Sequence, residues 1–89
     1  MRAIVTVIGK DKVGIIAEVC GLLAKNGVNV LDISQTVLQE YFTMIMLVDT
    51  AGCTVPFSEL SALLKSEGEA AALSVRIQRE DIFDAMHRI

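Results

Sequence analysis

The segment Tyr41–Asp49, which reads YFTMIMLVD, constrains the fold more than any other part of the chain. In a β-strand, successive side chains point to opposite faces. Here the residues of one face are apolar: Phe42, Met44, Met46 and Val48. Those of the other face are also largely apolar: Tyr41, Thr43, Ile45 and Leu47. A strand covered on one side only should alternate apolar with polar residues. We therefore expect a central strand, with helices on one face and a partner subunit on the other.

Three further strands are expected around this segment. Ala3–Ile8 is rich in β-branched residues and is bounded by Gly9. Val28–Gln39 is rich in Val, Ile, Leu and Thr, and Gln39-Glu40 forms a weak hairpin turn before Tyr41. Apolar and polar residues alternate over Leu73–Gln78, so the last strand should keep one face in water.

After Gly14 the apolar residues no longer follow the pattern of a strand but recur at helical spacing, which predicts a first helix over 14–26. Ile16, Cys20 and Leu23 recur at helical spacing, and this stripe is widened by Val19 and Leu22. Asn26-Gly27 is a stop signal, because glycine readily adopts the left-handed backbone that follows many helices.

A second helix is expected from Pro56, a residue suited to the first turn of a helix. It carries one apolar stripe: Phe57, Leu60, Leu63 and Leu64. Gly68 is its natural end, although Glu69–Ala72 either prolongs the helix or forms a separate turn. The tail 80–89 predicts a short C-terminal helix, since it is acidic at its start and has four apolar residues at helical spacing: Ile82, Phe83, Met86 and Ile89.

The expected order is therefore βαββαβ, in a single domain over residues 1–89 with its core in 2–80. Right-handed crossovers place both helices on one face of a four-stranded antiparallel sheet. The fold class is α+β, a ferredoxin-like sandwich with a helical tail.

Charge and hydropathy exclude several classes of protein. The net charge is −3, with 8 Lys and Arg against 11 Asp and Glu, so nucleic-acid binding is not expected. Hydrophobic residues make up 53% of the chain, yet no apolar run approaches the ~18 residues that span a bilayer. We attribute the excess to self-association rather than to a membrane. No signal peptide is recognisable, so we expect a cytoplasmic protein.

The residue types that carry catalysis are scarce. The single histidine, His87, lies in the tail, where it suits the C-terminus of a helix better than the role of a general base. Cys20 and Cys53 form no C-x-x-C pair; Cys20 fits a helix core, and Cys53 falls in a loop. No spacing typical of zinc ligands is present, so we expect neither a metal nor a cofactor and no catalytic residues.

The turn from Gly9 to Gly14, Gly-Lys-Asp-Lys-Val-Gly, leads into the start of the first helix. The first N–H groups of a helix are unpaired and partly positive, so they make a seat for a carboxylate. Gly14 lacks a Cβ and lets a ligand approach the backbone, and Asp11 suits an ammonium group. A structural interpretation stays open, in which Gly14 only allows close packing and Asp11 only caps the helix.

The same stretch, GKDKVGII over residues 9–16 followed by LLAKNGVNVLDI over 22–33, resembles the ACT domain. The resemblance covers about residues 2–80, and the closing segment 81–89 together with 42–46 resembles small stand-alone ACT proteins similar to those of the glycine-cleavage regulator. Such domains are small-molecule regulatory modules, often attached to enzymes of amino-acid metabolism. The resemblance implies the same βαββαβ fold and a regulatory function without catalysis.

The resemblance also implies a ligand site between two subunits. ACT domains commonly pair through the second strand, so a homodimer is expected, with an amino acid held between the first turn of one chain and the second strand of its neighbour. The ligand-binding residues it implies are Asp11, Val13, Gly14, Ile15, Ile16 and Asn29. Serine-sensing members have a histidine at the position of Gly9 and an asparagine at that of Asp11, so serine itself is not implied.

Two functions follow as hypotheses. The first is a homo-oligomeric amino-acid sensor that passes its signal to a regulated protein partner. The second is a protein-interaction module that keeps the fold but binds no ligand.

Overall fold

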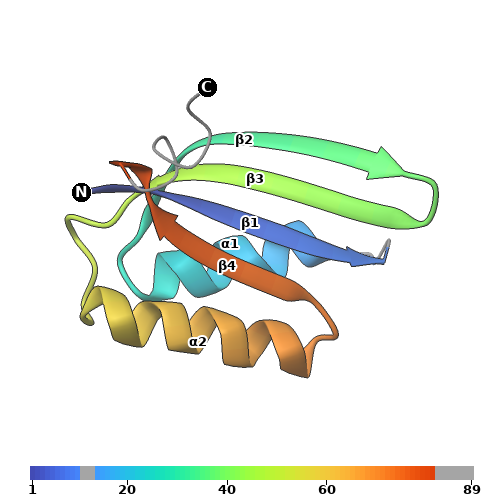
Figure 1. Cartoon of the computed structure of the whole chain (residues 1–89). Helices are drawn as coiled ribbons and strands as arrows, with labels where there is room; N and C mark the ends of the chain where they lie inside the picture. Colours follow the sequence, from blue (N-terminus) through green and yellow to red (C-terminus); the bar gives the residue numbers. More distant parts are fainter. Residues whose placement is uncertain (11–13, 82–89) are drawn as a thin grey trace.

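The computed structural model, which describes residues 1–10 and 14–81, has the predicted βαββαβ order (Figure 1). The strands are β1 (Arg2–Lys10), β2 (Asn29–Leu38), β3 (Tyr41–Asp49) and β4 (Ser74–Arg79). The helices are α1 (Ile15–Lys25) and α2 (Phe57–Ala70). The ferredoxin-like fold is therefore confirmed. The helix expected over 80–89 lies outside the described residues, apart from Glu80 and Asp81.

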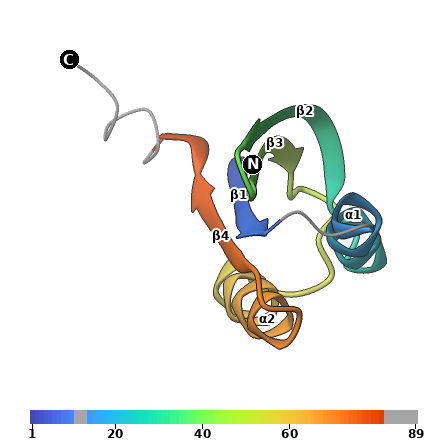
Figure 2. The same cartoon turned by 90° about the vertical axis from the view of Figure 1, so that its right-hand side faces the viewer.

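The four strands form one antiparallel sheet in the order β2-β3-β1-β4. Both helices lie on one face of it, and the other face carries no described element (Figure 2). β3 pairs with both β2 and β1, which confirms its central position. Neither α1 nor α2 is long and apolar enough to cross a membrane, and the only other helical residues among those described are Glu80 and Asp81.

The core lies between the sheet and the two helices. The side chains on the helix-facing side of β1, β3 and β4 are buried, and they pack against the inner faces of α1 and α2. This core is entirely apolar: Ala3, Val5, Val7, Ile15, Val19, Leu23, Val28, Phe42, Met44, Met46, Val48, Leu60, Leu64, Leu73, Val75 and Ile77.

The buried face of α1 agrees with the predicted stripe at Val19 and Leu23 but differs from it at the start of the helix. Ile15, Val19 and Leu23 are buried, whereas Ile16 is 36% exposed and Cys20 is half-buried. Ile15 lies on the face of α1 that packs against the sheet, and Ile16, the next residue, is turned about 100° away from that direction. Residues spaced by four then share that direction.

Gly68 does not end α2, which continues to Ala70. It is a buried helical residue, and a Cβ at this position would overlap the side chain of Val75. The Gly68 carbonyl also accepts a hydrogen bond from the N–H of Leu73 at 2.7 Å. Glycine is therefore needed there for the close approach of β4, and the chain reverses after the helix at Ala72, whose φ is 60°.

The predicted stop after α1 is confirmed at Gly27, which has a φ of 78°. Its N–H donates to Ala24 O at 3.0 Å, and the N–H of Val28 donates to Leu23 O at 2.9 Å. A Cβ on Gly27 would collide with the carbonyl oxygen of Gly52. The position therefore requires glycine for two reasons, the left-handed backbone and the adjacent loop.

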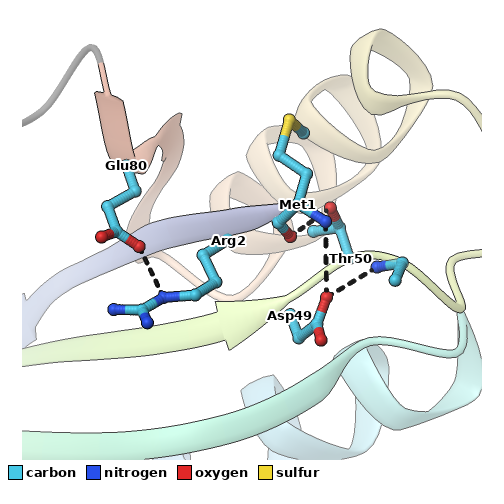
Figure 3. Close-up of polar contacts among 6 residues, drawn as sticks. Met1, Arg2, Asp49, Thr50 and Glu80 are labelled. Carbon is cyan, nitrogen blue, oxygen red and sulfur yellow. Dashed lines mark hydrogen bonds and ion pairs between the residues drawn. The ribbon is translucent and has the colours of Figure 1, made fainter.

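Polar contacts tie the ends of three strands together at one end of the sheet (Figure 3). The Asp49 carboxylate accepts a hydrogen bond from the Ala51 N–H at 2.9 Å and lies 3.5 Å from the Met1 amino nitrogen. The bond from Ala51 holds the pKa of Asp49 below its ordinary value, so its small contribution to stability is present at neutral pH and is lost as the pH falls through the lowered pKa. Arg2 pairs with Glu80 at 2.6 Å.

The two glycines of the α1 region provide a test of this account. Gly27→Ala should lower the free energy of unfolding by more than about 2 kcal/mol, because it adds left-handed strain to a collision with backbone. Gly21→Ala, in the exposed middle of α1 with nothing within 4 Å of its Cβ position, should raise it by about 0.5–1 kcal/mol. Urea denaturation of both variants measures these changes in the free energy of unfolding. Equal changes for the two variants would contradict the special role given to Gly27.

Candidate functional site

The described part of the turn after β1 ends in an open, left-handed glycine. Gly14 is the N-cap of α1, with φ 88° and ψ 1°, and no described side chain forms a capping hydrogen bond there. Among the described residues, its chain neighbours aside, no atom lies within 4 Å of the position where its Cβ would be. Asp11 and Val13, which the resemblance implies as ligand residues, lie outside the described residues. The close packing considered for Gly14 is therefore absent among the residues described, and the backbone there is accessible.

The start of α1 carries the electrostatics that anion binding requires. The Gly14 carbonyl accepts the first helical hydrogen bond from the N–H of Glu18 at 2.9 Å. The N–H groups that precede Glu18 have no acceptor within the helix and form the positive end of its dipole. Glu18 itself is exposed and places a negative charge in the same turn. A ligand that carries both a carboxylate and an ammonium group matches this arrangement better than a bare anion.

The two isoleucines of the predicted set face different surroundings. Ile15 is 2% exposed and belongs to the core, so only its backbone N–H is available to a ligand. Ile16 is 36% exposed, and its side chain is accessible from the outer surface of α1. The hydrophobic periodicity predicts Ile16 in the core stripe. Because its side chain is exposed instead, it is available for contact with a ligand or a second chain.

Asn29 is exposed and lies at the opposite end of the molecule from Gly14. It begins β2 and pairs with Asp49, which in turn pairs with Arg2. Gly14 follows the other end of β1, where Lys10 pairs with Tyr41. Figure 1 shows the start of α1 and the start of β2 at opposite ends of the sheet, and the 11 residues of α1 alone extend about 16 Å. One chain therefore does not bring Gly14 and Asn29 together.

β2 is an edge strand whose outer side has no partner among the described residues. It is ten residues long, and all of them except the half-buried Val30 are exposed. Both faces of the β2–β3 hairpin expose large apolar side chains: Leu31, Ile33, Val37, Leu38, Tyr41 and Ile45. The other edge, β4, has six residues and carries Arg76 and Arg79. Long apolar edges invite strand pairing, whereas short charged ones discourage it.

A groove of about 490 Å³ lies between α1 and α2. Its lining is mainly aliphatic, with Leu64, Leu73 and Val75 among the lining residues, and its charged side chains are Glu18, Lys25 and Glu67. Sequence reasoning missed this groove; the small residues Gly21 and Gly68 on the two helices were the available signal. The groove shares Glu18 with the start of α1 but includes none of the described residues of the turn.

The described residues contain none of the usual marks of a catalytic or metal centre. Within residues 1–10 and 14–81, no polar or charged side chain is buried, and no three His, Cys, Asp or Glu side chains are grouped to hold a metal ion. Cys20 and Cys53 are both half-buried, and the sulfur of Cys20 lies 4.0 Å from that of Met46. These thiols pack against the core rather than forming a pair.

Relatives of known sequence and structure extend over the whole chain. A UPF0237 protein of Clostridium acetobutylicum is 53% identical over 89 residues, which is 100% of both chains. The solved structure of an ACT domain protein from Streptococcus pneumoniae superposes with a TM-score of 0.83, at 45% identity and 98% of both chains. A putative glycine cleavage system transcriptional repressor shares the fold, with a TM-score of 0.72 and 24% identity over 86% of this chain and 44% of its own.

The ACT domain family model matches residues 2–78, which include both helices and all four strands almost to the end of β4. This match, the relatives and the βαββαβ architecture agree. The chain belongs to the ACT domain family.

Proposed function

We propose that the protein is a non-enzymatic regulatory homodimer that binds an amino acid at the seam between two chains. The observation that carries this proposal is the separation of Gly14 from Asn29 within one chain, combined with the unpaired edge of β2. Both residues are exposed, and within one chain each has only half of the proposed ligand-binding groups near it. A second copy supplies the missing half.

Two-fold pairing of β2 would bring these halves together. If two β2 strands pair antiparallel about their middle, near Ile33 and Ser34, the start of one strand lies beside the end of the other. Asn29 of one chain then approaches Leu38 of the second copy. Leu38 pairs with Tyr41, and Tyr41 pairs with Lys10 beside the turn that leads to Gly14. The pairing would therefore direct Asn29 to the turn end of the second chain.

The exposed hairpin supplies a driving force for such pairing. The outer N–H and C=O groups of β2 would gain partners, and its apolar side chains would leave water. Val37 and Leu38, whose side chains are 58% and 70% exposed, would lose much contact with water on pairing. A two-fold arrangement closes on itself and leaves no further edge of the same kind exposed.

The chemistry of the two halves favours a zwitterion. The first N–H groups of α1 suit a carboxylate, while the acids of the same region, Glu18 in the structure and Asp11 in the sequence, suit an ammonium group. The Asn29 amide can both donate and accept hydrogen bonds. Ile16 would contact the side chain of the ligand.

A ligand-free interaction module is the second candidate. The apolar surface of the hairpin favours it, because that surface supports assembly whether or not a small molecule binds. It differs from the first candidate in one respect: the dimer would form, and the turn would stay empty.

Binding of ligand is tested by calorimetry of the full chain against the standard amino acids. We expect at least one to bind, and Asn29→Ala to weaken its binding by at least about tenfold, since a buried hydrogen-bonding partner is worth about 1–3 kcal/mol. Gln35→Ala, an equally exposed amide in β2 away from its first residues, is the control and should bind normally. A folded dimer that binds none of them would leave the interaction module as the function.

Pairing through β2 is tested with two matched serines. Ser34→Lys, in the middle of β2, would bring two lysines together in the dimer and should shift the protein to monomer in sedimentation equilibrium, because like charges there repel and lose water. Ser74→Lys makes the same change in the exposed edge strand β4 and should leave the dimer intact. A dimer that persists in Ser34→Lys would rule out the β2 seam.

A further inference from the structure

The face of the sheet opposite the helices carries a row of apolar side chains. Along β1 and β3, the register places Ile4 opposite Leu47, Thr6 opposite Ile45 and Ile8 opposite Thr43. Ile4 and Leu47 are half-buried, while Ile45 and Ile8 are 41% and 45% exposed. No described element covers this face (Figure 2).

The chain leaves the described structure at the edge of this face. β4 ends at Arg79, and Gln78 pairs with Ile4 on the open side. Glu80, which follows Arg79, forms its ion pair with Arg2 at 2.6 Å (Figure 3). Arg2 lies two residues before Ile4, so the two side chains are on the same side of β1. This contact holds the point of departure beside the pair Ile4 and Leu47.

The eight residues that follow, 82–89, have the pattern and length to cover that pair. Their apolar members fall at helical spacing: Ile82, Phe83, Met86 and Ile89. Eight helical residues extend about 12 Å, and the distance from β4 across β1 to β3 is about 10 Å, two strand spacings. A helix laid across the sheet from β4 would therefore span both Ile4 and Leu47.

We propose that the tail 82–89 docks on the open sheet face of its own chain, with its apolar side on Ile4, Leu47 and Ile45. Asp84, His87 and Arg88 then face water. The short tether after Glu80 gives the tail a high effective concentration at this face, which a second copy in dilute solution does not match. The docked tail closes the sheet face and leaves β2 as the apolar edge available for pairing.

Cross-linking in the full chain tests the docking. In a background with Cys20→Ala and Cys53→Ala, the pair Leu47→Cys with Phe83→Cys should form a disulfide within one chain under mild oxidation. The control pair is Phe83→Cys with Ser58→Cys, since Ser58 is exposed in α2 on the other side of the sheet. Mass spectrometry and a non-reducing gel distinguish a link within one chain from a link between chains.

The proposal expects the Leu47 pair to link several-fold faster than the Ser58 pair, within one chain. Equal rates for the two pairs would show an undocked tail, and a link between chains would show that the tail covers a second copy; either result overturns the proposal.

Truncation after Asp81 supplies an independent readout. It should increase the fluorescence of a dye that binds exposed apolar surface, and it should leave the number of chains per particle in sedimentation equilibrium unchanged. If the dye signal does not change, the tail does not cover the face. If the truncated chain loses its partner, the face is an interface between copies, and docking within one chain is wrong.

Discussion

The architecture depends on the burial of β3, the strand whose two faces are both largely apolar. Its helix-facing side chains, Phe42, Met44, Met46 and Val48, lie in the core, and no polar side chain interrupts that core in the described residues. To bury this face, the sheet must place β3 inside, which sends β2 to the edge and requires both crossovers to pass on the same side. The open sheet face and the outer edge of β2, which has no partner among the described residues, are consequences of this arrangement.

The candidate site follows from the same topology. Since α1 runs antiparallel to β1 and β2 returns beside β3, the start of α1 and the start of β2 are held at opposite ends of one chain. Gly14 and Asn29 cannot meet unless a second chain is added with reversed direction. An edge strand long and apolar enough to recruit that chain is therefore part of the proposed ligand site.

The strands and the fold were predictable from sequence because their signals are local. The segment Tyr41–Asp49 is found with the predicted bounds, and Asn26-Gly27 ends α1 as expected. Tertiary contacts decide what the pattern left open or assigned differently: the sheet packs against the face of α1 that carries Ile15, so Ile16 is exposed, and α2 continues past Gly68 to Ala70, in agreement with the alternative of a longer helix. The exposure of β2 depends on strand order, which the hydrophobic periodicity does not reveal. The separation of Asn29 from Gly14 follows from the length of α1, and Asn29 itself was indicated by the family resemblance alone.

The most direct test of a site shared by two chains is complementation between two defective ones. Asn29→Ala and Gly14→Val each damage a different half, and a mixed dimer of the two retains one intact combination, with Gly14 from one chain and Asn29 from the other. Calorimetry with the amino acid that binds the parent protein should find little binding in either variant alone. After the two are mixed and allowed to exchange, the shared site predicts that binding returns at up to one ligand per mixed dimer. If mixing restores no binding, Gly14 and Asn29 do not form one site across two chains.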